Sequence, residues 1–223
     1  MPLTIAIDGP VGAGKSTISD EVAKRLHILH LDTGAMYRAI GLCALQRGID
    51  PRDEAAVCAL CEGGEAQIDV KYLDGAQHTL LNGADVSPLL RTQEVGAAAS
   101  AVSRYAPVRR MMVRQQQALA ARQAMLVDGR DIGTVVLPNA TVKVFLTATP
   151  ESRAKRRMLQ LREKGDQTPF EDILSEVNAR DLQDTTRAVT PLRRAGDAVL
   201  VDSSDLTFEE TVQAIISLVE AKQ

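Results

Sequence analysis

One glycine-rich segment near the start of the chain has the residue types and spacing of a phosphate-binding loop. It matches the pattern G-x-x-x-x-G-K-[ST] at every position, with Gly9, Pro10, Val11, Gly12, Ala13, Gly14, Lys15 and Ser16. Glycines let such a loop turn its N–H groups inward, and the N-terminus of the following helix adds positive partial charge. Lys15 would then reach the β- and γ-phosphates, and Ser16 would ligate Mg²⁺. The segment predicts a nucleoside triphosphate site; the alternative is a chance glycine-rich turn.

Two arginines follow predicted strands. Arg38 lies in the segment DTGAMYR and Arg130 in the segment DGRD. Open α/β sheets bind ligands beyond the carboxyl ends of their strands, so Asp8, Asp32 and Asp128 should converge there beside the P-loop. Arginine makes bidentate contacts with phosphate oxygens. The pair predicts a second phosphate position, whereas a surface ion pair is the ordinary role of any single arginine.

A third group of arginines lies later in the chain. Arg153, Arg156 and Arg157 have helical spacings of three and four, which place them on one helix face. After a loop at Lys164-Gly165 come Arg180, Asp181, Asp184 and Arg187. A mobile helical hairpin of this kind can close over phosphates, exclude water and neutralise charge during phosphoryl transfer. Solvated helix faces are the alternative, and we expect that role for at least one residue, Arg156.

Sequence motifs that other classes of P-loop protein carry are not found in this chain, which narrows its class. GTPases identify guanine with N-K-x-D, but none of the asparagines (Asn82, Asn139 and Asn178) precedes a lysine, and no D-x-x-G switch is found. Sensor elements typical of motor and DNA-dependent ATPases are also not found. A small P-loop chain with many arginines away from the loop therefore indicates a kinase acting on a small phosphorylated acceptor.

The elements that must position these residues alternate between strands and helices. Short apolar runs predict strands at residues 3–7, 30–31, 125–127, 142–146 and 199–201. Helical spacing predicts helices at 15–26, 35–47, 89–122 with a break near Pro107, 150–163, 169–183 and 207–221. Between them, residues 66–86 alternate around the turn signals Asp74-Gly75 and Asn82-Gly83. We therefore expect an α/β P-loop fold of three layers with a central parallel sheet, a small antiparallel insert and a helical lid.

Composition sets the wider limits. The chain has 223 residues, of which 45% are apolar and 25% are charged, so global disorder is excluded. No apolar run approaches the length of a membrane-spanning helix. The net charge is −3, but residues 104–194 hold 17 Lys and Arg against 10 Asp and Glu. This local excess favours an anionic ligand over a nucleic-acid footprint.

Two observations bear on the compartment. The first residues, MPLTIAIDG, do not resemble a secretory signal, and the three cysteines are odd in number. We expect a reducing compartment, the cytoplasm. Cys58 and Cys61 form a C-x-x-C pair without a second pair or a nearby histidine, so we expect ordinary positions in a short helix.

At this point the chain resembles the bacterial cytidylate kinases, a branch of the nucleoside monophosphate kinases, over nearly its whole length. Besides the P-loop, the resemblance rests on LDTGAMYRA at 31–39, VSPLLRTQEV at 86–95, DGRDIGTVV at 128–136, RRMLQL at 156–161, RD…DTTR at 180–187, PL at 191–192, DAVLVDSS at 197–204 and LTFEE at 206–210. Adenylate and guanylate kinases share the loop but not DGRDIGT or VSPLLRTQEV. The resemblance is therefore specific to the cytidylate branch.

The resemblance implies a role for individual residues of this chain. ATP with Mg²⁺ would occupy residues 9–17, including Thr17, with Ser16 on the metal and Asp128 reaching it through water. The acceptor phosphate would contact Thr33, Arg38 and Arg130, with Arg187 nearby. Ser100, Arg109 and Asp131 would recognise the cytosine edge, and Asp131 would repel the carbonyl that uracil presents there. Asp184, oriented by Arg180, would meet the ribose, and Tyr37 would also line the CMP site.

The resemblance also implies a division of the chain and a set of catalytic side chains. A single kinase domain would have its core at 1–33, 104–150 and 191–223, a monophosphate-binding insert at 34–103 and a lid at 151–190. Lys15, Arg130, Arg153, Arg157 and Arg187 would be catalytic, with Arg153 and Arg157 serving the lid. The chain departs from the family at Gln183, where a lid arginine is typical, and Thr33 replaces a frequent Ser but keeps the hydroxyl.

The expected activity is transfer of the γ-phosphate of ATP to CMP or dCMP by a cytoplasmic monomer with no membrane or nucleic-acid partner. One alternative is a kinase for UMP or a non-nucleotide metabolite, which would show no preference for cytosine. Another is a P-loop nucleotide sensor that binds nucleic acid through residues 104–194. Such proteins usually bind bases by stacking them on aromatic side chains, and this chain has only three Tyr, three Phe and no Trp, which disfavours this alternative.

Overall fold

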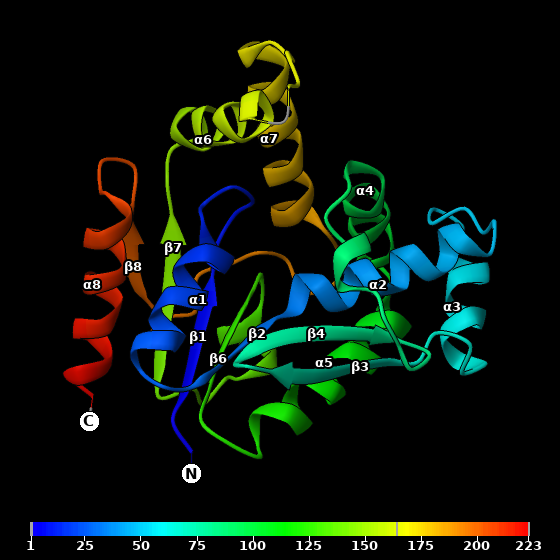
Figure 1. Ribbon diagram of the computed structural model, residues 1–223, viewed down its shortest axis with the longest axis horizontal. Helices are drawn as coiled ribbons and strands as arrows, with labels where there is room; N and C mark the ends of the chain where they lie inside the picture. The colour runs from blue at the N-terminus through cyan, green and yellow to red at the C-terminus, as the bar shows by residue number, and fades with distance from the viewer. Residues whose placement is uncertain (1, 164, 223) are drawn as a thin grey trace. The chain divides into compact units, whose positions relative to one another are not determined.

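The computed structural model describes residues 2–163 and 165–222. They form two compact units. We call the first the P-loop unit, which comprises Pro2–Ile28 and Ala124–Gln223, and the second the meander unit, Leu29–Gln123. The predicted fold class is confirmed: a parallel sheet is flanked by helices, and a small antiparallel sheet is present as well (Figure 1).

The P-loop unit is built on parallel strands. Strand β1 (Thr4–Asp8) pairs on one side with β6 (Met125–Gly129) and on the other with β7 (Val142–Thr147), and β7 pairs with β8 (Val199–Asp202). All these pairings are parallel. The register sets Ile7 beside Asp128 and Asp8 beside Gly129. The carboxyl ends of β1 and β6 are therefore neighbours, as a common ligand edge requires.

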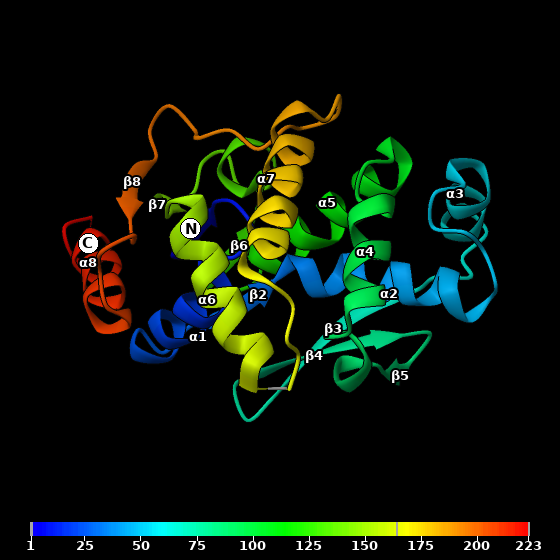
Figure 2. The ribbon, with the colours of Figure 1, turned by 90° about the horizontal axis from the view of Figure 1, so that it is seen from above.

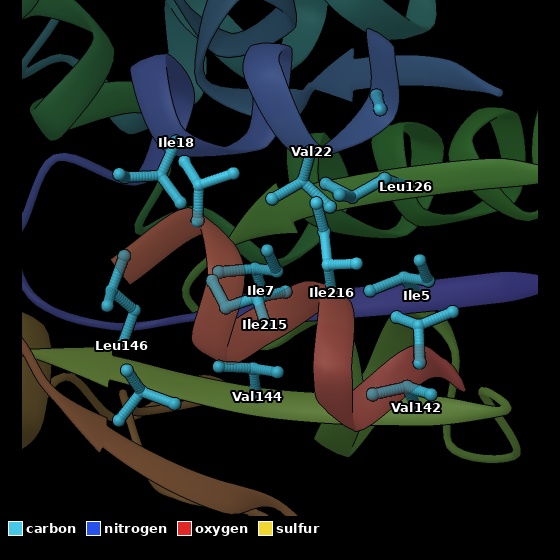
Figure 3. Close-up of a cluster of buried hydrophobic side chains, with 14 of the residues drawn as sticks. Ile5, Ile7, Ile18, Val22, Leu126, Val142, Val144, Leu146, Ile215 and Ile216 are labelled. Atoms are coloured by element: carbon cyan, nitrogen blue, oxygen red, sulfur yellow. The ribbon is translucent and has the colours of Figure 1, made fainter. Parts of the chain in front are cut away.

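The core of this unit lies between the sheet and two helices, α1 (Lys15–Arg25) and α8 (Phe208–Glu220). Alternate residues of each strand face the helices because side chains along a strand point to opposite faces. Figure 3 shows these side chains interdigitating, with Ile18 and Val22 from α1, Ile215 and Ile216 from α8, and Ile5, Ile7, Leu126, Val142, Val144 and Leu146 from the strands. This packing holds the strand ends in place below the P-loop.

A helical hairpin follows β7. Its arms are α6 (Pro150–Glu163) and α7 (Phe170–Thr186), which lie side by side in Figure 2. The two helices bury a small apolar cluster of their own, Ala154, Ile173 and Val177, with Met158, Leu161, Phe170 and Leu174 packed around it. The helices predicted at 150–163 and 169–183 are confirmed.

The turn after β6 was not predicted. A π-helical turn, Ile132–Val136, follows β6 directly after the segment DGRD. Its β-branched residues have no helical or alternating pattern that would indicate such a turn. Its backbone N–H groups at Ile132 and Gly133 are bonded to the carboxylate of Asp8, a partner far away in the sequence.

The meander unit begins with β2 (Leu29–Asp32) and α2 (Thr33–Gln46), followed by α3 (Glu54–Glu62). Strands β3 (Ile68–Leu73), β4 (Ala76–Leu81) and β5 (Ala84–Asp85) then form the predicted antiparallel meander. Asp74 and Gly75 have φ values of 51° and 80°, and Asn82 and Gly83 have 51° and 85°. Both turns thus have the two consecutive positive φ values that tight hairpins need, as the sequence predicted.

The rest of this unit is helical. After a single 3₁₀ turn, Ser87–Leu89, come α4 (Gln93–Val102) and α5 (Ala106–Ala120). Pro107 lies in the first turn of α5, so the predicted break is confirmed. Helix α4 packs closely on α2, because a Cβ on Gly41 would lie 2.9 Å from the Cβ of Ala98. No helix within residues 2–163 and 165–222 is long and apolar enough to cross a membrane.

The C-x-x-C pair lies on α3, in the short helix that the sequence predicted. Cys58 and Cys61 are free thiols, and Cys61 is buried. Burial raises the pKa of the Cys61 thiol to about 11, so it is protonated and unreactive at neutral pH. Among the residues described, no cluster of His, Cys, Asp and Glu could hold a metal ion by itself.

Candidate active site

The P-loop connects β1 to α1, and its glycines have backbone conformations that other residues rarely adopt. The φ angle is 155° at Gly9, 76° at Gly12 and 84° at Gly14, which is the residue preceding α1. A Cβ on Gly9 would lie 1.9 Å from the carbonyl oxygen of Leu146, so only glycine fits there. The glycines thus let the loop end at a helix N-terminus, where N–H groups and the helix dipole attract anions.

Lys15 lies at the base of this loop. Its side chain is buried, and Nζ donates a hydrogen bond to the carbonyl oxygen of Pro10 at 2.8 Å. Burial, together with repulsion from Arg130, lowers its pKa to about 7, against the attraction of nearby carboxylates. A bound phosphate would favour the charged form and raise this pKa. Nζ of Lys15 can therefore exchange its hydrogen bond to Pro10 for a contact with a bound anion.

Ser16 lies next to the carboxyl end of β6. Its Oγ donates a hydrogen bond to Oδ2 of Asp128 at 3.1 Å, and Asp128 is buried. A hydroxyl and a carboxylate are hard oxygen donors of the kind that Mg²⁺ takes, usually together with water and substrate phosphates. The two residues therefore fit the magnesium ion that the sequence predicts there.

Asp8 has a different role from the one expected of a residue at the ligand edge. Its two carboxylate oxygens accept hydrogen bonds from the backbone N–H groups of Ile132 and Gly133, both at 2.7 Å. Burial raises its pKa to about 6, although these two hydrogen bonds oppose the shift. Asp8 therefore holds the turn that follows Arg130 and Asp131. The sequence signal was only its position immediately before Gly9.

The last turns of α7 meet the segment that follows β6. Nε of Arg130 donates to Oδ2 of Asp184 at 2.8 Å, and Nη2 of Arg187 lies 3.7 Å from Oδ1 of Asp131. Burial alone would raise the pKa of Asp184, but Arg130, with Arg180 and Arg187, outweighs burial and lowers it. The structure thus brings together Arg130, Asp131, Asp184 and Arg187, with Arg180 on the same helix.

The three arginines of α6 differ in their surroundings. Arg153 is buried, and its guanidinium donates to Ala148, Val11 and Asp181. Arg156 is half-buried and donates to Oγ of Ser203 at 3.2 Å and also to the carbonyl oxygen of Ser203, so it does not lie on the solvated helix face expected of it. Arg157 is exposed. Sequence reasoning noted Asp181 but missed it as the partner of Arg153, because helical spacing does not indicate contacts between helices.

The remaining predicted residues belong to the meander unit. Thr33, Tyr37 and Arg38 occupy the start of α2, where the side chain of Asp32 caps the helix by accepting from the backbone N–H of Ala35 at 3.1 Å. Nη1 of Arg38 lies 4.0 Å from Oδ2 of Asp32. This grouping presents an arginine and a buried hydroxyl at a helix N-terminus, which suits a phosphate.

Arg109 and Tyr37 form a second grouping in this unit. The guanidinium carbon of Arg109 lies 5.5 Å from the centroid of the Tyr37 ring, within the range of a cation–π contact. Nη1 of Arg109 also donates to the carbonyl oxygen of Ser103 at 3.0 Å. Oγ of Ser103 in turn donates to the carbonyl oxygen of Ser100 at 3.1 Å. Arg109 is thus buried and oriented, as a residue that recognises a base needs to be.

The chain matches known proteins over nearly its full length. The family model described as "Cytidylate kinase" matches residues 5–221. A cytidylate kinase of Caldicellulosiruptor bescii is 48% identical over 216 residues, which cover 97% of this chain and 95% of the relative. A cytidylate kinase of Bacillus licheniformis is 44% identical over 221 residues, which cover 99% of this chain and 97% of the relative.

Solved structures are similar in fold. The crystal structure of a shikimate kinase from Bacteroides thetaiotaomicron aligns with a TM-score of 0.50 at 14% identity and covers 98% of each chain. An uncharacterised protein from Eubacterium ventriosum aligns with a TM-score of 0.51 at 10% identity and covers 99% of each chain. At such identities the likeness is one of fold alone.

Proposed function

The chain belongs to the cytidylate kinase family, and from this membership we propose that it transfers the γ-phosphate of ATP to CMP or dCMP, giving ADP and CDP or dCDP. The observation that carries the proposal is the pairing of β1 with β6. It sets the P-loop, which follows β1, beside the Arg130–Asp131 segment, which follows β6. A donor loop and a charged acceptor segment at neighbouring strand ends are what phosphoryl transfer between two nucleotides needs.

ATP binds to residues 9–17 in this proposal. The backbone N–H groups of the loop bind its phosphates, and Lys15 leaves the carbonyl of Pro10 to contact the β- and γ-phosphates. Ser16 would hold Mg²⁺ directly and Asp128 would hold it through a water molecule, as their 3.1 Å contact allows. When bound, Mg²⁺ supplies charge neutralisation at the phosphate oxygens.

CMP binds through the residues that the family membership implies. Thr33, Arg38, Arg130 and Arg187 hold its phosphate. Ser100, Arg109 and Asp131 recognise cytosine, and Tyr37 supports Arg109 through their cation–π contact. Asp184, with Arg180 beside it, contacts the ribose. Asp131 accepts a hydrogen bond from the exocyclic amine of cytosine, whereas the carbonyl of uracil at that position is repelled.

The reaction needs no strong general base. The attacking phosphate oxygen of CMP is already anionic, and it approaches the γ-phosphorus in line with the oxygen that leaves as ADP. Catalysis then consists of positioning and of neutralising charge with Lys15, Arg130 and Arg187, joined by Arg153 and Arg157. A lid at residues 151–190 excludes water, which would otherwise take the phosphate. The proposed division of the kinase domain also includes a core at 1–33, 104–150 and 191–223 and a monophosphate-binding insert at 34–103.

The surroundings of the enzyme also belong to the proposal. We expect a monomer in the cytoplasm with ATP, CMP and dCMP as its partners and no nucleic acid. The three thiols, Cys43, Cys58 and Cys61, are free, which suits a reducing compartment.

A coupled assay of ADP formation with Mg²⁺ tests the function. CMP, dCMP, UMP, AMP and GMP are supplied separately at equal concentration. We expect ADP to form much faster with CMP and dCMP than with the other three nucleotides. Equal slow turnover with all five, or none, would contradict the proposal and leave a P-loop protein with another acceptor.

A further inference from the structure

We propose that Asp181 is a positioning residue for ATP: it holds Arg153 under the P-loop and so links the lid helix α7 to the donor site. This inference rests on the proposed function and deepens it. It also gives Arg153 a role in shaping the loop, in addition to the charge neutralisation proposed for it.

The first step of the argument is the set of contacts that Arg153 makes. Its side chain is 3% exposed. Nε donates to the carbonyl oxygen of Ala148 at 2.9 Å, Nη1 donates to the carbonyl oxygen of Val11 at 2.9 Å and to Oδ1 of Asp181 at 3.0 Å, and Nη2 donates to Oδ2 of Asp181 at 2.5 Å. Four of the five guanidinium N–H groups are therefore bonded within the protein. While these bonds persist the guanidinium stays with the loop, so a direct contact between Arg153 and a phosphate requires some of them to break.

The second step concerns the loop. Val11 is in the middle of the P-loop, and the adjacent Gly12 has a φ of 76°. A Cβ on Gly12 would lie 3.3 Å from the Cβ of Arg153, so the stem of Arg153 packs directly against the loop backbone. A hydrogen bond to the Val11 carbonyl and a close packing contact at Gly12 together fix the loop from below. Movement of Arg153 must therefore alter the positions of the N–H groups that bind phosphate.

The third step concerns α7. Asp181 and Asp184 are three residues apart, which places them on the same side of the helix. Asp184 bonds Arg130 at 2.8 Å, and Arg187, one turn further on, lies 3.7 Å from Asp131. The same end of one helix thus contacts the donor loop through Asp181 and Arg153 and the acceptor segment through Asp184 and Arg187. The connection of α7 to the donor loop therefore depends on the contact between Asp181 and Arg153.

The geometry also explains why a carboxylate is needed. The guanidinium presents two parallel N–H groups, which match the two oxygens of a carboxylate. In an Asp181→Asn variant one oxygen is replaced by an NH₂ group, which cannot accept from Arg153. The buried Arg153 then loses its counter-charge, and its guanidinium shifts from the position that holds Val11.

The Asp181 side chain is 24% exposed, beside a cavity of about 430 Å³ that Pro10, Arg153 and Asp181 help to line. Water can therefore solvate the asparagine, and the variant should fold.

The experiment uses the full chain and the variants Asp181→Asn and Arg153→Lys, singly and together. The dissociation constant of ATP with Mg²⁺ is measured calorimetrically without acceptor, and KM for ATP, KM for CMP and kcat are measured in the coupled assay. We expect Asp181→Asn to raise the ATP dissociation constant and KM about tenfold or more, with KM for CMP within about threefold of wild type. The double variant should be no more than about threefold worse than the worse single variant, because both changes break one link.

Glu176→Gln is the matched control, since Glu176 is exposed on the same helix and the substitution changes charge by the same amount. It should leave every constant at its wild-type value. A folded Asp181→Asn protein with wild-type ATP affinity overturns the proposal, even if its melting temperature is lower. Equal losses for ATP and CMP also overturn it. If the wild-type chain binds ATP but phosphorylates no monophosphate, the proposed function fails, while the ATP affinities still test the role of Asp181.

Discussion

The P-loop and the segment that follows β6 both offer positive groups to phosphates, but they do so with different parts of the chain. The loop uses main-chain N–H groups whose directions are set by glycine φ angles. The β6 side uses side chains, and Arg130 and Arg187 are already beside Asp184 and Asp131. In the proposed function, ATP therefore meets main-chain donors that the fold has already set, whereas CMP must compete with carboxylates for the arginines.

This difference has an energetic consequence. Main-chain donors fixed by the fold need no reorganisation when the ligand arrives, which is the condition for strong electrostatic stabilisation. On the acceptor side, an incoming phosphate must displace a carboxylate such as that of Asp184, which is buried and would then lose its counter-charge. The proposed acceptor side must therefore rearrange its ion pairs when a ligand binds, while the loop backbone of the donor side need not rearrange.

The largest effect is expected from removing the ammonium group of Lys15 from the donor side. Lys15→Ala leaves the loop backbone intact but removes the ammonium that would meet the β- and γ-phosphates. We expect kcat/KM to fall about 10²–10⁴-fold. Lys24→Ala, at the exposed end of the same helix, is the control and should retain full activity. A Lys15→Ala enzyme within about threefold of wild type would contradict this assignment.

The second prediction concerns the backbone of the loop. In Gly9→Ala the new Cβ would lie 1.9 Å from the carbonyl oxygen of Leu146, so β1 and β7 must separate. We expect a loss of stability of about 3 kcal/mol or more, measured by denaturant unfolding. Gly48→Ala is the matched control, because Gly48 also has a positive φ, 68°, but open space around it, and it should cost about 1 kcal/mol. Equal losses would show that φ alone, rather than the close approach to Leu146, makes glycine necessary at position 9.

The same difference between the two sides decides what could be predicted from the sequence. The strand, loop and helix around Gly9 are contiguous in the chain, so their residue types and spacing were sufficient. The turns at Asp74-Gly75 and Asn82-Gly83 were predictable for the same reason, since their geometry is local. The π-helical turn was not, because the acceptor of its N–H groups is Asp8, more than a hundred residues away.

On the acceptor side, the position of Arg130 after a strand predicted a phosphate contact, whereas the roles of Asp131 and Asp184 came only from the resemblance. The spacing of Arg130 and Asp184 in the sequence does not show that Nε of Arg130 lies 2.8 Å from Oδ2 of Asp184. In the same way, the spacing of Arg153, Arg156 and Arg157 predicted one shared face. The tertiary contacts then gave them different surroundings, with Arg153 buried under the loop and Arg157 exposed.

The third prediction sharpens the acceptor side. Asp131→Asn removes the charge that faces Arg187 and replaces one acceptor oxygen with a donor. We expect kcat/KM for CMP to fall about 10–100-fold, because a hydrogen bond to a charged group contributes about 1.5–3 kcal/mol. The value for UMP should fall less or rise, so that the preference for CMP shrinks. Asp172→Asn, exposed in the first turn of α7, is the control. An unchanged CMP-to-UMP ratio would exclude Asp131 as the residue that recognises the base.

The smallest expected effect is the number of protons taken up on ligand binding, which should differ between ATP on the donor side and CMP on the acceptor side. Burial and Arg130 lower the pKa of Lys15 to about 7, so we expect neutral Lys15 to be the more abundant form at pH 8 in the free protein. Phosphates favour the charged form and raise the pKa, so ATP binding at pH 8 should take up a proton, up to one per site. The acceptor side relies on arginines, which stay charged at this pH, and CMP binding should take up none. Calorimetric titrations at pH 8 in buffers of different ionisation enthalpy measure both values. If the ATP enthalpy is independent of the buffer, Lys15 is already charged in the free protein, and the donor side is fully prepared in charge as well as in backbone.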